Sequence, residues 1–229
     1  MCGLAGIAGP EADVETVTRM VATLAHRGPD HSRVWNADGI ALGHARLSIV
    51  DLSPAGHQPL SNEDSTIRTI VNGEIYNAPQ LRRELERCGH RFSSKSDSEV
   101  ILHLYEESGA EFLPRLNGMF AFALWDEHSR TLLLARDRLG IKPLYIRRTA
   151  GSLIFASEVK ALDEAAGVAP QLDPQGLAQC LAYANQFGSR SMTSGVEMLE
   201  PGTLLQWRGG AREGSPILAT RVPLRPDGI

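Results

Sequence analysis

The chain has 229 residues, 42% hydrophobic and 22% charged, with a formal net charge of −4. These values indicate a globular protein with a full hydrophobic core and exclude disordered, collagen-like and coiled-coil classes. The slightly acidic balance, the lack of a signal-peptide pattern and the lack of any apolar run near 20 residues predict a cytoplasmic protein without nucleic-acid or membrane partners.

The first third of the chain is predicted to be rich in strands. Residues 3–9 are small and apolar and indicate a short buried strand. After Asp13, apolar residues at helical spacing predict a helix that ends near His26, before a Gly-Pro pair. Asn72-Gly73 indicates a tight turn after the last of three short β-prone segments, which span residues 40–42, 47–50 and 67–71.

Two helices are predicted next, each with a polar residue at its start. Asn77 is placed to cap a helix that ends at Gly89. Ser96 and Glu99 have the spacing of a capping box, which puts Asp97 in the first turn of the following helix.

The second half is predicted to return to strands. Residues 119–125 pair with 131–136, and residues 142–147 form a hairpin with 153–157. A helix then runs from Asp173-Pro174 to about Tyr183 and a last strand covers residues 203–207. Without regular βαβ alternation, this order favours an α+β fold of antiparallel sheets covered by helices, with a domain over residues 2–210 and a linker-like tail over 211–229.

The cysteines and histidines restrict the chemistry. Cys2, Cys88 and Cys180 are odd in number and lack CxxC spacing, so we expect reduced thiols, with Cys88 and Cys180 in the core. The seven histidines form no HExxH or comparable pair, and no metal site is expected.

Cys2 is the candidate nucleophile. Removal of Met1 would leave Cys2 with a free α-amine, whose pKa near 8 lets it accept the thiol proton. The resulting thiolate is a strong nucleophile. The alternative is that a cysteine after the initiator methionine has no functional meaning.

Seven segments strengthen the functional interpretation, because in this order and spacing they resemble the glutaminase domain of glutamine-hydrolysing asparagine synthetases over residues 2–207. They are MCGLAGIAG, HRGPD, HARLSIVD, VNGEIYN, SDSEVILHLY, GMFAFALWD and RDRLGIKPLY. Those domains are class II glutamine amidotransferases, so the resemblance implies a four-layer αββα sandwich of the N-terminal nucleophile hydrolase type. In HRGPD and RDRLGIKPLY, whose roles are less clear, we favour an ion-paired scaffold over a catalytic function.

The resemblance also implies roles for the site residues. Cys2 would attack the side-chain amide of L-glutamine and form a thioester, with its own amine as base and acid. The Asn72 amide and the Gly73 N–H would stabilise the oxyanion, although Asn-Gly without this context is more often a hairpin turn.

Charged residues are expected to bind the two ends of glutamine. Arg46 suits the α-carboxylate because a guanidinium can bind it bidentately, and the following residues Leu47, Ser48, Ile49 and Val50 would line the pocket. Asp97, and less strongly Glu74, would bind the ammonium. Alternatively, Asp97 could only stabilise its own helix, as a negative charge at the N-terminal end of the helix dipole.

The chain lacks the pyrophosphate loop of the synthetase domain and other phosphate-binding motifs. We therefore expect no cofactor in this chain, with ATP and magnesium only on a synthetase domain acting in cis or in trans. A free-standing amidotransferase subunit serving another synthetase and a catalytically silent binding module remain as alternatives, and a homodimer stays open.

Overall fold

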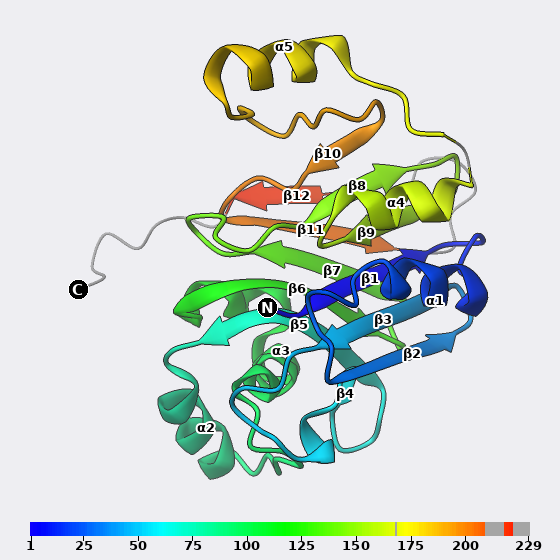
Figure 1. Cartoon of the computed structure of the whole chain (residues 1–229). Helices are drawn as coiled ribbons and strands as arrows, with labels where there is room; N and C mark the ends of the chain where they lie inside the picture. The colour runs from blue at the N-terminus through cyan, green and yellow to red at the C-terminus, as the bar shows by residue number, and fades with distance from the viewer. Residues whose placement is uncertain (168, 209–217, 222–229) are drawn as a thin grey trace.

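The fold of residues 1–167, 169–208 and 218–221 is seen in a computed structural model, in which two six-stranded antiparallel sheets lie face to face (Figure 1). The first sheet has the order β10 (Val196–Met198), β8 (Tyr145–Arg148), β9 (Leu153–Ala156), β1 (Gly3–Ala8), β3 (Ile40–Arg46) and β2 (His31–Ala37). The second has the order β12 (Leu218–Arg221), β11 (Thr203–Arg208), β7 (Thr131–Arg136), β6 (Gly118–Asp126), β5 (Ile67–Ile75) and β4 (Leu60–Ser61).

Helices cover the outer face of each sheet (Figure 1). α1 (Val14–Ala22) and α4 (Val159–Ala166) pack on the first sheet, and α2 (Ala78–Arg87) and α3 (Val100–Ser108) pack on the second. α5 (Pro174–Tyr183) lies apart from both, and three short 3₁₀ segments are η1 (Pro54–Gly56), η2 (Asp97–Glu99) and η3 (Gly109–Arg115). Among the described residues, no helix has the length and apolar character that crossing a membrane requires.

The central strands of each sheet, such as β1 and β6, have apolar residues on both faces because both sides of the sheet are covered there. In β1, Leu4 packs between the sheets whereas Ala5 packs under α1. In β5, Ile70 faces the other sheet and Val71 faces α2 and α3. Alternating side chains therefore fill three apolar layers, which confirms the predicted α+β fold with a four-layer αββα sandwich.

Several predicted elements are confirmed. β1, β6 with β7, β8 with β9, α5 and β11 lie where their patterns placed them, although boundaries differ by a few residues. Asp13 caps α1, since its side chain accepts a hydrogen bond from Thr16 N at 2.7 Å. α1 is shorter than predicted and ends at Ala22.

The prediction of a turn at Asn72-Gly73 is wrong, because both residues lie inside β5. They pair with Ala121 and Phe120 of β6. A Cβ atom at Gly73 would lie 2.1 Å from the Met119 carbonyl oxygen, so glycine is needed for close strand packing.

Other local predictions also fail. Residues 47–50 form a loop, and β2, α4 and β10 were not predicted. The Asn77 side chain makes no cap to α2 and instead accepts from Asn117 N. Ser96 caps η2. Glu99 does not complete a capping box, because its carboxylate accepts hydrogen bonds from the backbone N–H and hydroxyl groups of Ser93 and Ser94.

The cysteines and the tail also differ in part from expectation. All three cysteines are free, but Cys88 is exposed and Cys180 is half-buried, so neither is a core thiol. Of the predicted tail, residues 218–221 form β12 against β11, and residues 211–217 and 222–229 lie outside the described residues.

Candidate active site

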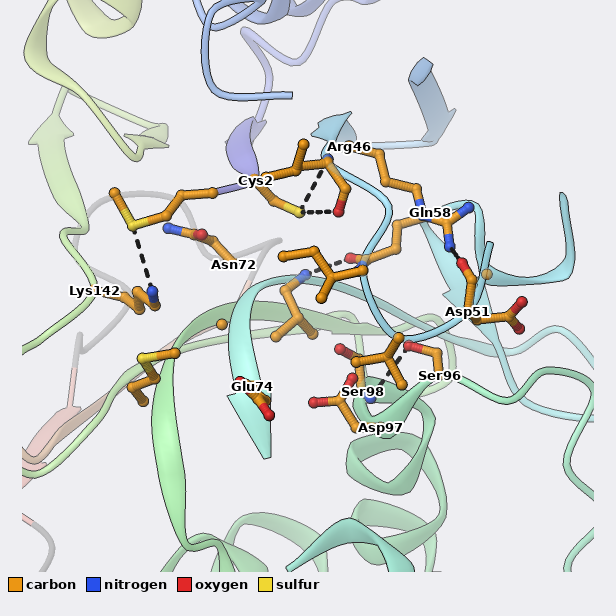
Figure 2. A pocket seen from close by; sticks show the side chains of 18 residues that line it. Cys2, Arg46, Asp51, Gln58, Asn72, Glu74, Ser96, Asp97, Ser98 and Lys142 are labelled. Atoms are coloured by element: carbon orange, nitrogen blue, oxygen red, sulfur yellow. Dashed lines mark hydrogen bonds between the residues drawn. The ribbon is translucent and has the colours of Figure 1, made fainter. Parts of the chain in front are cut away.

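A pocket of about 160 Å³ opens where β1 begins, next to the edge of β5. Cys2 lies at one side of it and the carboxylates of Glu74 and Asp97 at the other (Figure 2). The lining residues come from seven chain segments and are Met1, Cys2, Arg46, Leu47, Ile49, Val50, Asp51, Gly56, Gln58, Val71, Asn72, Gly73, Glu74, Ser96, Asp97, Ser98, Met119 and Lys142.

The Cys2 thiol is held beside the loop that follows β3. Its Sγ lies 3.4 Å from Leu47 N, which donates to it, and 3.6 Å from Leu47 O. Burial raises the pKa of the Cys2 thiol, while the Leu47 N–H and nearby positive charges lower it. A burial-raised pKa means that a base is needed to form the thiolate at neutral pH.

The HRGPD segment supports the Cys2 backbone. Arg27 Nε donates to the Cys2 carbonyl oxygen at 2.9 Å, and Arg27 Nη1 pairs with Glu158 at 2.7 Å. Asp30 accepts from Ser48 N at 2.7 Å and so fixes the Leu47 segment. These contacts agree with the predicted scaffold function of this motif.

The RDRLGIK segment also fixes its surroundings, but it does so through hydrogen bonds to backbone groups. The predicted ion pairs of its arginines and aspartate are not found among the described residues. Arg136 donates to the carbonyl oxygens of Gly140, Lys142 and Leu199. The buried Asp137 accepts from four backbone N–H groups, at Phe120, Leu139, Ile141 and Lys142.

One edge of β5 faces the pocket because β4 pairs with it only as far as Thr69. Along this edge the N–H of Val71 donates to Gln58 Oε1 at 2.5 Å, and the N–H of Ile75 donates to Asp97 Oδ2 at 2.6 Å. N–H groups two residues apart point to the same edge of a strand. The N–H of Gly73, between these two, therefore points into the pocket.

Asn72 brings an unpaired amide to the same place. The residue is 1% exposed, and neither its Nδ2 nor its Oδ1 has a hydrogen-bond partner among the described residues. A buried amide without partners costs free energy, which a bound ligand oxygen can offset. Asn72 and Gly73 thus offer two donors for an oxygen atom.

Two carboxylates lie on the opposite side of the pocket. Burial, together with the negative charge of the exposed Glu74, raises the pKa of Asp97. A cation bound there would offset both effects. The site therefore favours a ligand with an ammonium group.

Arg46 supplies positive charge at the end of β3. It is buried and donates to the carbonyl oxygens of Ser53, at 3.0 Å, and Asp51. A guanidinium has five N–H donors, so donors remain after these two contacts. Arg46 thus both lines the pocket and shapes the loop over residues 47–53.

The structure brings almost all predicted site residues together. Ser48 is the exception, since it is absent from the pocket lining and its N–H is directed to Asp30. The roles predicted for the gathered residues stay predictions.

Gln58, Asp51 and Lys142 also line the pocket and were not predicted as site residues. Gln58 holds Val71 next to Asn72, and Asp51 accepts from Ser53 N and Lys95 N, each at 2.8 Å. Lys142 is buried and its Nζ lies 3.4 Å from Met1 Sδ. Lys142 belongs to RDRLGIKPLY, so the motif itself could have pointed to it.

Asp51 joins the loop over residues 47–53 to the segment before Asp97. Hydrogen bonds from the Ser53 side chain and from Lys95 and Ser53 N–H groups lower the pKa of Asp51 from 3.8 to about 2. Folding thus favours the charged Asp51 carboxylate. Its contribution to the free energy of unfolding is present above pH 3.8 and is lost as the pH falls toward 2.

We expect Asp51→Asn to lower the free energy of unfolding by about 1–2 kcal/mol at pH 7. Urea denaturation should show that the difference from wild type shrinks between pH 4 and pH 2. The exposed Asp38, changed to Asn, is the control. A pH-independent difference would contradict this account of Asp51.

His44 links the two sheets behind the pocket. Its Nε2 lies 3.0 Å from the Val71 carbonyl oxygen, and burial lowers the pKa of His44 to about 4. A neutral imidazole therefore joins β3 to β5 next to Asn72.

Comparison with known proteins gives three findings. Residues 1–216 match the family model described as glutamine amidotransferase domain. The chain is 40% identical over 185 residues to asparagine synthetase (glutamine-hydrolyzing) 3 of Bacillus subtilis, covering 78% of this chain and 30% of that protein. It is 47% identical over 169 residues to the Arabidopsis thaliana protein named asparagine synthetase (glutamine-hydrolyzing) 3, covering 72% and 29%.

A solved structure shares the fold. Glutamine phosphoribosylpyrophosphate amidotransferase from B. subtilis aligns with a TM-score of 0.71 at 23% identity, over 96% of this chain and 49% of that chain. The chain thus spans about half of this structural neighbour and, as the coverage above shows, under a third of the two synthetases.

Proposed function

Since the chain belongs to the glutamine amidotransferase domain family, we propose that its pocket hydrolyses the side-chain amide of L-glutamine to glutamate and ammonia. One observation carries the proposal. The Cys2 thiol, the Gly73 N–H and the Asn72 amide, which has no hydrogen-bond partner among the described residues, line the same pocket. Arg46 and Asp97 line it too, and they suit the two charged ends of an amino acid.

The nucleophile forms once Met1 is removed. The freed α-amine of Cys2 accepts the thiol proton. Such a base is required because burial raises the pKa of the thiol. Removal of Met1 also takes away the thioether sulfur that contacts Lys142 Nζ at the pocket.

Attack and release follow from the same groups. The thiolate forms a bond to the amide carbon, and the carbonyl oxygen becomes an oxyanion that accepts from Asn72 Nδ2 and Gly73 N. The Cys2 ammonium returns its proton to the leaving nitrogen, which departs as ammonia and leaves a thioester. Water, deprotonated by the Cys2 amine, then attacks the thioester, so glutamate departs and the thiol re-forms.

Glutamine is selected at its α-carbon. Arg46 binds the carboxylate, while Asp97 with Glu74 binds the ammonium, and Leu47, Ile49 and Val50 cover the chain between. These contacts are made equally in the ground state and the transition state, so they set KM more than kcat.

We expect Asp97→Asn to raise KM for glutamine by about 10–100-fold, which corresponds to the binding free energy of one charge-assisted hydrogen bond. Asparagine at 97 keeps an acceptor for Ile75 N, so the fold is preserved. Arg46→Ala should act in the same direction. Steady-state kinetics that show a lower kcat with unchanged KM would contradict this division of roles.

The ammonia requires an acceptor. Both synthetases compared above are about three times as long as their matched part, so we propose that ammonia passes to a synthetase-type ATP-dependent domain, in cis or in trans. The exposed apolar side chains of Leu181, Tyr183 and Phe187 on and after α5 offer a surface for such a domain.

Three free thiols are consistent with a cytoplasmic setting.

The direct test of function is hydrolysis of glutamine labelled with ¹⁵N at its amide. The proposal predicts equal amounts of glutamate and labelled ammonia, without ATP, and no release from asparagine. The proposal would be contradicted if the mature chain left glutamine intact both on its own and in the presence of a synthetase domain.

A further inference from the structure

A second group of chemically active side chains lies outside the pocket lining. Glu63 precedes β5, His90 follows α2, and His103 and Glu106 lie on α3. One ligand atom from each lies within 4.8 Å of all the others. The sequence showed no metal motif because three distant segments supply these residues.

The distances within this cluster fit one small ion. His103 Nδ1 lies 2.9 Å from Glu106 Oε2 and 3.6 Å from Glu63 Oε2. His90 Nδ1 lies 3.5 Å from Glu106 Oε2 and 3.9 Å from Glu63 Oε1. Bonds of about 2.0–2.1 Å in a tetrahedron separate neighbouring ligand atoms by about 3.4 Å, close to these values.

Outer contacts orient the ligand atoms. His90 Nε2 lies 2.9 Å from Glu107 Oε1, the arrangement in which a carboxylate fixes the tautomer of a metal-binding histidine. Glu106 Oε1 accepts from Asn62 Nδ2, and Glu63 Oε1 accepts from Arg91 N, each at 2.8 Å. His103 Nε2 is buried without a hydrogen-bond partner among the described residues and lies 3.9 Å from Glu99.

The charge balance also favours a cation. Four carboxylates, on Glu63, Glu99, Glu106 and Glu107, surround the two imidazoles. Within the described part of the chain, no lysine or arginine side chain pairs with these four groups. Even with both imidazoles protonated, two negative charges would remain, so an ordinary ion-pair network leaves the cluster unbalanced.

We propose that Glu63, His90, His103 and Glu106 bind one divalent transition-metal ion, with Zn²⁺ as the preferred ion. Two imidazole nitrogens and two carboxylate oxygens form a ligand set that Zn²⁺ accepts in tetrahedral geometry. The Glu63 side chain is 40% exposed, which gives the ion a path from solvent, whereas that of His103 is 1% exposed. The ion would link three segments, which are the connection between β4 and β5, the residues after α2, and α3 itself.

The test uses the Cys2→Ala chain, so that the active-site thiol cannot bind metal. After treatment with EDTA, titration calorimetry with ZnCl₂ should give one ion per chain. At a hundredfold excess over Kd, the thermal midpoint should rise by about 5–10 °C. Bound Co²⁺ should show the strong visible absorption of four-coordinate cobalt.

Glu63→Gln and His90→Gln change partly exposed side chains and should each weaken Zn²⁺ binding at least tenfold, with unchanged circular dichroism. The exposed His128, changed to Gln, is the matched control and should bind as the parent does. Absence of 1:1 binding in the parent, or equal affinity in the Glu63 and His90 variants, would overturn the proposal. Glutamine hydrolysis is not used as a readout, so the result is independent of the proposed function.

Discussion

Cys2→Ala is expected to reduce glutamine hydrolysis by at least about 10⁴-fold, because it removes the atom that forms the thioester. The fold should be unchanged, since the Cys2 side chain makes its described hydrogen bonds only to the Leu47 backbone. Alanine keeps the α-amine, so the variant tests the thiol separately from the base. The measurement is the rate of ammonia release at saturating glutamine.

The other two cysteines provide the control for this variant. Cys88 is exposed and Cys180 is half-buried, and neither lines the pocket. Cys88→Ala and Cys180→Ala should therefore keep the rate within about twofold, as for ordinary surface substitutions. A comparable loss in all three variants would show that Cys2 has no special function.

Asn72→Ala is expected to lower kcat by about 10²–10³-fold with a smaller change in KM. This is the usual effect of removing one oxyanion donor, which acts mainly in the transition state. The Asn72 amide has no partner in the described residues, so its loss breaks no hydrogen bond of the fold. Steady-state kinetics of the folded variant measure the effect.

Thr69 offers a matched control on the same strand. It is fully buried in β5, and its hydroxyl donates to the Ala123 carbonyl oxygen at 3.0 Å. Thr69→Ala should reduce stability and leave kcat nearly unchanged. An equal fall in kcat for both variants, or a pure KM effect for Asn72→Ala, would contradict the oxyanion role.

The sequence predicted many of the helices and strands well because their signals are local, whereas the four-layer arrangement followed from the resemblance. Helical spacing after Asp13 and the continuous apolar run of β6 are properties of a few neighbouring residues. It failed at Asn72-Gly73, where a turn-forming pair lies inside a strand. The reason is tertiary, since β6 comes too close to β5 for any side chain at position 73.

The candidate site was predictable where a residue belongs to a motif of the family. Cys2, Arg46 and Asp97 were expected to meet, and they line one pocket. Gln58 could not be found in this way, because its importance comes from a hydrogen bond to Val71, 13 residues away. The cluster around His103 was hidden for the same reason, since its residues meet only in the folded chain.

The central claim is that Cys2, as the first residue of the mature chain, attacks glutamine. The most direct measurement is peptide mass mapping after labelling with 6-diazo-5-oxo-norleucine, a glutamine analogue that alkylates nucleophilic thiols. We predict one adduct, on a peptide that begins with Cys2 and lacks Met1, and protection of this peptide by glutamine. An adduct on Cys88 or Cys180, or full labelling and hydrolysis by a chain that keeps Met1, would contradict the claim.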